Sequence, residues 1–363
     1  MVRENSISRT HCALEPAWKG TLSEEQAPRT PGSRQSPSSI RASAAAAGSV
    51  LRKRRFMAWP WPHLVACMLA ACALTGCSHD PHPQVVVYAA QDQVYSEPIL
   101  QEFEKRTGIR VRAVYDSEAV KTVGLANRLL AEKNHPQADL FWGNEELRTR
   151  QLAVQGVFRE TNGVATFGYR TRRIVINTNR LALADAPRSL TELTNPVWRG
   201  KVALGYPLFG TTATHFLALR QHWGAGPWEA WCRALQANEA LVVDGNSVVV
   251  KFVGRGEAWI GLTDSDDVAA GQREGLPIVA LPTGPDTLFI PNTVGVIRGG
   301  PHPAEAGRLL EYLQSPEVLT RLVEVNALEG ARTERGTGLA VDWDALLGEL
   351  EAGTQTLRGL FLR

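Results

Sequence analysis

The chain has few cysteines for its 363 residues, and their positions exclude a disulfide framework in the part that we expect to fold. Cys12, Cys67 and Cys72 precede Cys77, and only Cys232 follows it. If the mature protein begins at Cys77, a single thiol remains beyond its first residue, so no set of disulfides can form. We expect Cys232, which lies in a predicted helix, to be an inert buried thiol.

An excess of charge and the common enzyme signatures are also missing. Lysine and arginine number 39 against 37 acidic residues, a net charge of +2, and no basic run follows Arg55. We therefore expect no nucleic-acid partner. Beyond Cys77 the sequence has no HExxH, GxSxG, CxxC or Walker P-loop motif. These absences count against the common enzyme classes, and we expect a protein that is not an enzyme.

The first 49 residues have few large apolar side chains. Residues 29–50 consist mostly of Ser, Ala, Pro and Arg, which cannot bury a core. We expect residues 1–49 to be a disordered or mis-annotated leader. Translation that begins near Val50 or Met57 would account for it.

Residues 50–76 have the pattern of a secretory signal. Basic residues 52–55 precede an apolar run that begins near Leu64 and ends in Leu74-Thr75-Gly76-Cys77. This ending resembles a lipobox, in which the cysteine is lipidated and becomes the first mature residue. The alternative is a short membrane anchor or a buried helix, although the run is short for a span of about 20 residues. The lipobox predicts a periplasmic or cell-surface protein that touches the membrane only through its lipid anchor.

After a tether over residues 77–84, the mature chain alternates strands with helices, which predicts an α/β fold of mainly parallel sheets flanked by helices. The 287 residues from Cys77 onward suffice for two domains. The change of pattern near Asn177 and again near Ser265 suggests two lobes joined by a two-crossing hinge. We expect lobe 1 over residues 85–177 plus 268–363, and lobe 2, inserted, over 178–267.

Polar residues follow the predicted strands, at the edge where open parallel sheets bind ligands and helices begin. Several carboxylates in one cleft repel each other unless a metal cation or an amine lies among them. Each candidate side chain has a structural role as the alternative to ligand binding. Acidic residues in the first turn of a helix interact favourably with the helix dipole, and the acids at positions 264–267 suit a solvated turn. Hydroxyl and amide side chains at these positions are also common helix N-caps. The candidates are Gln91, Asp92, Ser117, Glu118, Lys121, Trp142, Asn144, Glu145, Thr211, Thr212, Asn246, Ser247, Asp264, Asp266 and Asp267.

Two of these candidates have two possible roles each. Lys121 pairs with Glu118 or holds an anion, and Trp142 forms an aromatic cleft wall or packs in the core. We expect His215 and His222, which do not have paired-ligand spacing, to be structural.

The order of several segments resembles a known family. Val85-Val86-Val87-Tyr88, residues 103–109, 115–125, 138–142 and 256–264 are similar to bacterial solute-binding proteins of ABC importers, closest to the ferric-iron-binding branch. The resemblance implies the type II periplasmic-binding-protein fold. It also implies a monomer that needs no cofactor, captures a solute between its lobes and delivers it to a permease and its ATPase.

At the metal site the sequence departs from that branch, which places a histidine after strand one, a glutamate after strand three and a tyrosine pair after the second hinge. The resemblance implies ferric iron or a chelate as cargo, here on Asp92, Glu145, Asp266 and Asp267, with a companion anion near Ser117, Lys121 and Thr211. An alternative keeps the fold for a phosphonate, a phosphate ester or an amine-bearing molecule. A secreted metal-dependent hydrolase and a tethered sensor are further alternatives.

Overall fold

The computed structural model describes residues 82–116, 121–159, 164–331 and 336–362, all within one compact unit, Cys77–Arg363. The expected leader, the signal segment, Cys77, Ser117 and Glu118 lie outside the described residues, and of Lys121 only the backbone is described. Within these ranges, no helix combines the length and the hydropathy that crossing a membrane requires.

The described chain is a mixed α/β structure, as predicted, in which the strands follow the order β2-β1-β3-β9-β4-β7-β5-β6, with β8 paired to β4. The strands are β1 (Gln84–Ala89), β2 (Arg110–Val114), β3 (Leu140–Gly143), β4 (Val164–Asn177), β5 (Val202–Gly205), β6 (Leu241–Val243), β7 (Ile260–Asp264), β8 (Ile278–Ala280) and β9 (Phe289–Val296). The α-helices are α2 (Gln93–Thr107), α3 (Lys121–Ala131), α4 (Glu146–Val154), α5 (Gly210–Trp223), α6 (Ala225–Ala237), α7 (Asn246–Arg255), α8 (Ser265–Arg273), α9 (Pro303–Leu313), α10 (Pro316–Glu324) and α11 (Trp343–Phe361).

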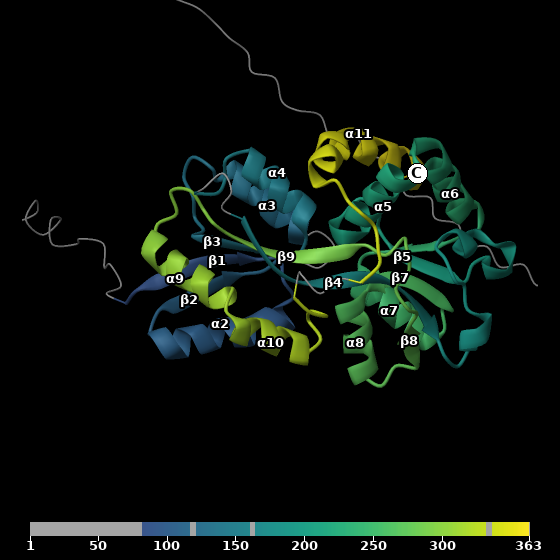
Figure 1. Cartoon of the computed structure of the whole chain (residues 1–363), viewed down its shortest axis with the longest axis horizontal. Helices are drawn as coiled ribbons and strands as arrows, with labels where there is room; N and C mark the ends of the chain where they lie inside the picture. Colours follow the sequence, from purple (N-terminus) through teal and green to yellow (C-terminus); the bar gives the residue numbers. More distant parts are fainter. Residues whose placement is uncertain (1–81, 117–120, 160–163, 332–335, 363) are drawn as a thin grey trace, which may run out of the picture. The chain divides into compact units, whose positions relative to one another are not determined.

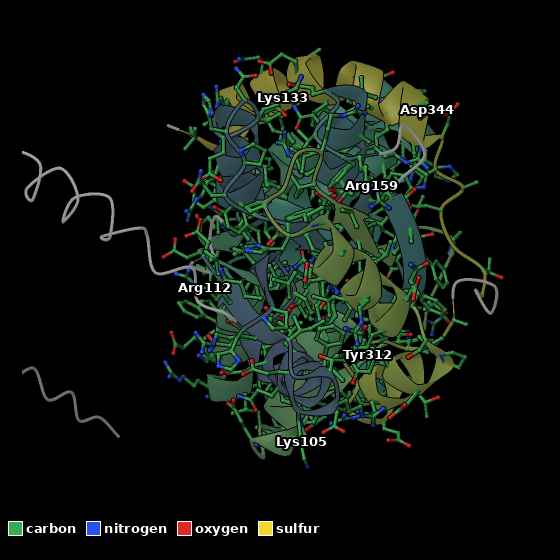
Figure 2. The ribbon with its side chains drawn as sticks, turned by 90° about the vertical axis from the view of Figure 1, so that its left-hand side faces the viewer. Lys105, Arg112, Lys133, Arg159, Tyr312 and Asp344 are labelled. Carbon is green, nitrogen blue, oxygen red and sulfur yellow. The ribbon has the colours of Figure 1, made fainter. Side chains whose placement is uncertain are left out.

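Helices cover both faces of the first sheet, in which β1 runs parallel to β2 and β3 while β9 is antiparallel to β3. Val85 and Val87 of β1 pack in one core with α2 and α9, and Tyr88 packs in another with α3 and α4. This alternation follows from the two-residue period of a strand. Figure 1 shows α3 and α4 above these strands, and Figure 2 shows Lys105 of α2 and Tyr312 of α9 on the opposite side from Lys133.

The second sheet repeats this arrangement with β5 parallel to β6 and β7. Leu204 and Leu262 pack against α5, α6 and α11, whereas Ala203 and Val175 pack against α7 and α8. In Figure 1, α5, α6 and α11 accordingly lie above these strands and α7 and α8 below. The two sheets therefore have the same layered construction.

The long strand β4 joins the sheets. Residues 164–171 pair with β9, and residues 172–176 pair with β7. The chain thus passes between the sheets within β4, at Thr171–Arg172, and returns in the segment between β8 and β9. The sequence analysis had instead expected the crossings near Asn177 and Ser265. Helix α11 belongs to the range 268–363 that we expected in lobe 1. Its Leu346 and Leu357 instead pack in the core that contains α5 and α6.

Helix α2 has well-defined ends. Gly108 ends it with a φ of 71°, in the left-handed region that glycine enters easily. Asp92 is the N-cap residue, and the Ser96 hydroxyl lies inside the helix and donates to the Asp92 carbonyl at 3.0 Å. Cys232 is fully buried as predicted, and burial, with a smaller effect of Glu229, raises the pKa of its thiol to about 12.

Candidate functional site

The candidate residues divide between the carboxyl edges of the two sheets. Gln91 and Asp92 follow β1, and Asn144 and Glu145 follow β3, which is paired with it. In the second sheet, α5, α7 and α8 are the next helices after β5, β6 and β7, and each begins within a few residues of the end of its strand. The backbone N–H groups of the first turns of these three helices therefore lie along one edge, which favours a negatively charged group.

Asp264, at the end of β7, is the centre of a buried ion-pair network. Its Oδ1 lies 2.7 Å from Nη1 of Arg172, and its Oδ2 lies 3.4 Å from Nη2 of Arg170. Oδ2 also accepts hydrogen bonds from the Thr211 hydroxyl at 2.7 Å and from Asn246 Nδ2 at 3.1 Å. Both oxygens of this predicted ligand-binding carboxylate are therefore occupied by partners from the protein.

Electrostatics agree with this geometry. Burial alone raises the pKa of Asp264, but the attraction of Arg172 and Arg170 and the hydrogen bond from Thr211 more than offset it, so the pKa is lowered overall. The carboxylate is thus ionised at neutral pH, and its charge is balanced inside the protein. Sequence reasoning missed both arginines, although the three arginines in residues 169–177 (YRTRRIVIN), just before an apolar run, could have indicated buried partners.

The other two hinge acids lie in the first turn of α8. One oxygen each from Asp264, Asp266 and Asp267 lies within 4.8 Å of the others. Nε of Arg170 lies 3.3 Å from Oδ1 of the buried Asp266. The Arg170 and Arg172 guanidinium groups therefore offset part of the negative charge of these carboxylates. The acids are brought together as predicted, but beside the two arginines.

Glu145, a predicted metal ligand, is fully buried and caps α4. Its carboxylate accepts from the N–H groups of Leu147 at 2.9 Å and Arg148 at 2.8 Å, and from the Thr214 hydroxyl of α5 at 3.0 Å. Burial raises the pKa of Glu145, and these donors and the Arg148 charge lower it only in part. Iron ligation would require the carboxylate to release these donors.

Two buried amides lie at the edge of the first sheet. Gln91 is 1% exposed and Asn292 of β9 is 0% exposed, and the side-chain amide atoms of neither have a hydrogen-bond partner within the described residues. Register places Asn292 one residue beyond the Gly143–Thr293 pair, next to the end of β3. Gln91 was predicted, whereas Asn292 was missed because it lies inside a strand. Asp92 is half-buried at the N-cap of α2.

Trp142 packs in the core. Its side chain is 0% exposed, and its ring centroid lies 6.1 Å from that of Phe167. In this structure it is therefore placed as a packing residue and not as an exposed cleft wall.

The small polar residues of the second sheet form one network around Asn246. Its Oδ1 accepts from Arg172 at 2.8 Å and from Thr212 at 3.3 Å, while its Nδ2 donates to Thr211 at 3.0 Å. A Cβ on Gly205 would lie 3.0 Å from Thr212 Oγ1, so glycine keeps this edge compact. Ser247, in the next position of α7, is half-buried.

His215 is buried, as a structural histidine should be. Its Nε2 lies 2.9 Å from the Asp286 carbonyl oxygen. Burial and, to a smaller extent, Arg172 lower its pKa to about 3. The imidazole is therefore neutral at physiological pH. His222 is exposed.

Known proteins resemble this chain over most of its length. The family profile described as "Bacterial extracellular solute-binding protein" matches residues 84–324. The "Fe(3+)-binding periplasmic protein" of Serratia marcescens is 29% identical over 197 residues, which are 49% of this chain and 56% of that relative. A "Probable ABC transporter periplasmic-binding protein" of Sinorhizobium fredii is 24% identical over 275 residues, covering 64% and 75% of the two chains.

Solved structures have the same fold. Iron-bound HitA from Pseudomonas aeruginosa has a TM-score of 0.68 at 21% identity, covering 77% of this chain and all of that one. AfuA from Actinobacillus pleuropneumoniae, with fructose-6-phosphate bound, has a TM-score of 0.67 at 17% identity, covering 77% and 99%. The match of a family profile across most of the described residues confirms the resemblance found in the sequence. The chain belongs to the bacterial extracellular solute-binding proteins and has the α/β fold of type II periplasmic binding proteins.

Proposed function

We propose that this protein is the receptor of an ABC importer and that its solute is a small organic anion of the phosphate-ester or phosphonate class. The observation that carries the proposal is the convergence of the α5, α7 and α8 N-termini at one sheet edge where Arg170 and Arg172 offset the acidic residues. The receptor delivers its solute to a membrane permease and its ATPase. A permease and an ATPase encoded beside the gene would favour import over a sensor role.

The chemistry of this edge suits a phosphoryl group. Helix N-termini present backbone N–H donors and a partial positive charge, and the hydroxyl of Ser247 lies in the first turn of α7. The buried amides of Gln91 and Asn292, on the first sheet, supply donors and acceptors for the uncharged part of the solute. AfuA, with fructose-6-phosphate bound, has the same fold.

Ferric iron is the second candidate. The oxygens of Asp264, Asp266 and Asp267 lie within 4.8 Å of one another, and carboxylate oxygens suit a hard cation. The Serratia marcescens relative is named an Fe(3+)-binding protein. Two observations count against iron. To bind iron, Asp264 would have to break its ion pair with Arg172 and its hydrogen bond from Thr211, and Glu145 would have to break its hydrogen bonds from the N–H groups at the start of α4. An amine-bearing solute would use the same acids as ammonium partners.

Thermal melting of the full chain distinguishes these cargoes. The panel is fructose-6-phosphate, methylphosphonate, inorganic phosphate, ferric citrate and small amines. A ligand that binds only the folded state stabilises it by about 2.7 kcal/mol at a hundredfold excess over its Kd. We expect an upward shift with a phosphate ester or phosphonate. A shift with ferric citrate alone, abolished in the double variant Asp266→Ala/Asp267→Ala, would establish the second candidate instead.

A negative charge introduced at the N-terminus of α7 tests whether the anion binds there. Ser247→Asp introduces a carboxylate in the first turn of α7, where acids favour the helix and folding should persist. The added charge repels a phosphoryl group and attracts a cation. Ser247→Asn, similar in size to Asp but uncharged, is the matched control. Equal affinity of the two variants for a phosphate ester that binds the wild type would overturn the proposed position of the anion.

We also propose that signal cleavage before Cys77 and lipidation of its thiol tether the protein, as a monomer, to a membrane in the periplasm or at the cell surface. The support is the lipobox-like sequence Leu74-Thr75-Gly76-Cys77. Extracellular solute-binding proteins act outside the cytoplasm, which agrees with an export signal.

A further inference from the structure

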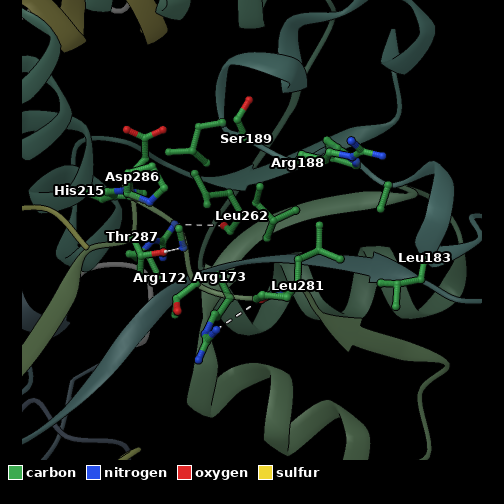
Figure 3. A pocket seen from close by; sticks show the side chains of 18 of the residues that line it. Arg172, Arg173, Leu183, Arg188, Ser189, His215, Leu262, Leu281, Asp286 and Thr287 are labelled. Atoms are coloured by element: carbon green, nitrogen blue, oxygen red, sulfur yellow. Dashed lines mark hydrogen bonds between the residues drawn. The ribbon is translucent and has the colours of Figure 1, made fainter. Parts of the chain in front are cut away.

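A second cavity lies within the half of the molecule built on β5, β6 and β7. It has a volume of about 400 Å³, within the range of small-molecule sites. The segments 183–190 and 281–287, the strands β4 and β7, and His215 of α5 line it. Figure 3 shows Leu183 and Arg188 at one end of the cavity and His215 and Asp286 at the other. The Asp266 and Asp267 carboxylates and the N-terminus of α7 are not part of its lining.

The wall of the cavity is largely apolar. Ile174, Leu262 and Leu281 come from strands or the segment after β8, and Pro282 and Pro285 stiffen the loop opposite. Leu183, on the same wall, is 63% exposed. A large apolar side chain exposed beside an apolar cavity enlarges the surface that a ligand with an apolar body would remove from water.

Arg188 is the charged group of the cavity that is open to a ligand anion. Arg173 forms an ion pair with Glu329 at 2.7 Å, and Asp286, at the other end of the cavity, accepts a hydrogen bond from Nε1 of Trp223 at 3.0 Å. The Arg188 side chain is exposed at the wall, and within the described residues its guanidinium group forms no ion pair, although the Glu192 carboxylate accepts from its backbone N–H at 2.9 Å. An acidic group of a ligand can therefore pair with this guanidinium group.

The inner end offers a hydrogen-bond acceptor. His215 is neutral, and its Nε2 donates to the Asp286 carbonyl, which leaves Nδ1 with a lone pair. Nδ1 is buried and has no hydrogen-bond partner among the described residues. A buried acceptor without a partner costs free energy, which a ligand N–H or O–H that reached it would recover.

We propose that this cavity is a second ligand site, for an amphipathic organic anion with an aromatic or branched apolar body, an acidic group that pairs with Arg188 and a donor for His215. The site is separate from the solute site at the helix N-termini and does not depend on the identity of that solute. Arg172, which lines the cavity and pairs with Asp264, connects the two.

Binding of the dye 1-anilinonaphthalene-8-sulfonate to the full chain tests this site, since the dye joins an apolar body to a sulfonate and an N–H donor. We expect saturable fluorescence enhancement, and at least tenfold weaker binding of N-phenyl-1-naphthylamine, which lacks the sulfonate. Arg188→Glu should weaken dye binding about tenfold or more. Arg255→Glu, an exposed charge reversal at the end of α7, should leave it unchanged.

A second variant tests the location independently of charge. Ala184 is exposed on the cavity wall, so Ala184→Trp should fold and fill the cavity from its rim. We expect this variant to lose saturable dye binding while its melting temperature stays near that of the wild type. Ser247→Asp should retain dye binding, because it alters the other site. Equal dye affinity in the wild type, Arg188→Glu and Ala184→Trp, or no saturable binding by the wild type, would overturn the proposal.

Discussion

The buried pair of Arg172 and Asp264 makes a quantitative prediction about stability. The side chains of the two residues are 0% and 3% exposed, and their closest atoms are 2.7 Å apart. Asp264→Asn keeps the size of the side chain but leaves the Arg172 guanidinium buried without its carboxylate. Removal of one partner of a buried pair costs about 3–5 kcal/mol of the free energy of unfolding. We expect Asp264→Asn to lose stability in this range.

The double variant Arg172→Met/Asp264→Asn should lose much less than the sum of its single variants, because no unpaired guanidinium then remains beside residue 264. We expect a coupling energy of about 2 kcal/mol or more, within the range for residues in one ion-pair network. Urea unfolding followed by tryptophan fluorescence measures it, as a change in midpoint at constant slope. The chain has 10 tryptophans, so the signal is adequate.

A surface pair provides the control. Arg199 and Glu239 are closer, at 2.5 Å, but their side chains are 62% and 60% exposed. Solvent screens such a pair, so the cycle Arg199→Met/Glu239→Gln should show a much smaller coupling energy. If the single changes at Arg172 and Asp264 added without coupling, or if the exposed pair coupled as strongly, the argument that burial makes this network energetically important would be refuted.

Three further predictions concern other residues. The folded state raises the pKa of Glu145 above its ordinary value of 4.5, so the contribution of this residue to stability is complete below pH 4.5 and is lost as pH rises through the folded-state pKa. The free energy of unfolding of the wild type, relative to that of Glu145→Gln, should therefore fall as pH rises, as urea titrations at several pH values will measure. A difference that rises with pH would contradict this. Cys77→Ser should release the protein from the membrane fraction, and retention there would argue against lipidation. The Cys232 thiol, whose pKa is raised to about 12, should react with a maleimide only after unfolding, which mass spectrometry of its peptide will measure. Rapid labelling of the folded protein would contradict the burial of this thiol.

The sequence by itself determined the features that depend on local period and on chain order. The alternation of strands with helices predicted the α/β class. The apolar run at Val85 is typical of a buried strand and forms β1, and Gly108 ends α2 because a glycine enters the left-handed region easily. The order of short segments predicted the family, which the profile match over residues 84–324 confirmed. These inferences need only neighbours along the chain.

The candidate site was predicted only in outline. The strand-end rule located Asp264, Asp266, Thr211 and Asn246 at one edge, and the structure brings these residues together. Their chemistry was not predictable, because the charges that balance the acids come from Arg170, which is 94 positions from Asp264 in the chain. Which strands lie side by side, and thus which side chains meet, depends on the packing of the whole sheet.

Tertiary structure alone decided the remaining roles. Glu145 became a buried helix cap held by Thr214, 69 positions away, and Trp142 became a core residue. Helix α11 joined the core of α5 and α6, far from its neighbours in the sequence, because the apolar stripe that includes Leu346 and Leu357 completes that core. The second cavity combines segments around Arg188, His215 and Leu281. Local patterns specify elements, whereas burial and long-range pairing select which side chains meet and how their charges are balanced.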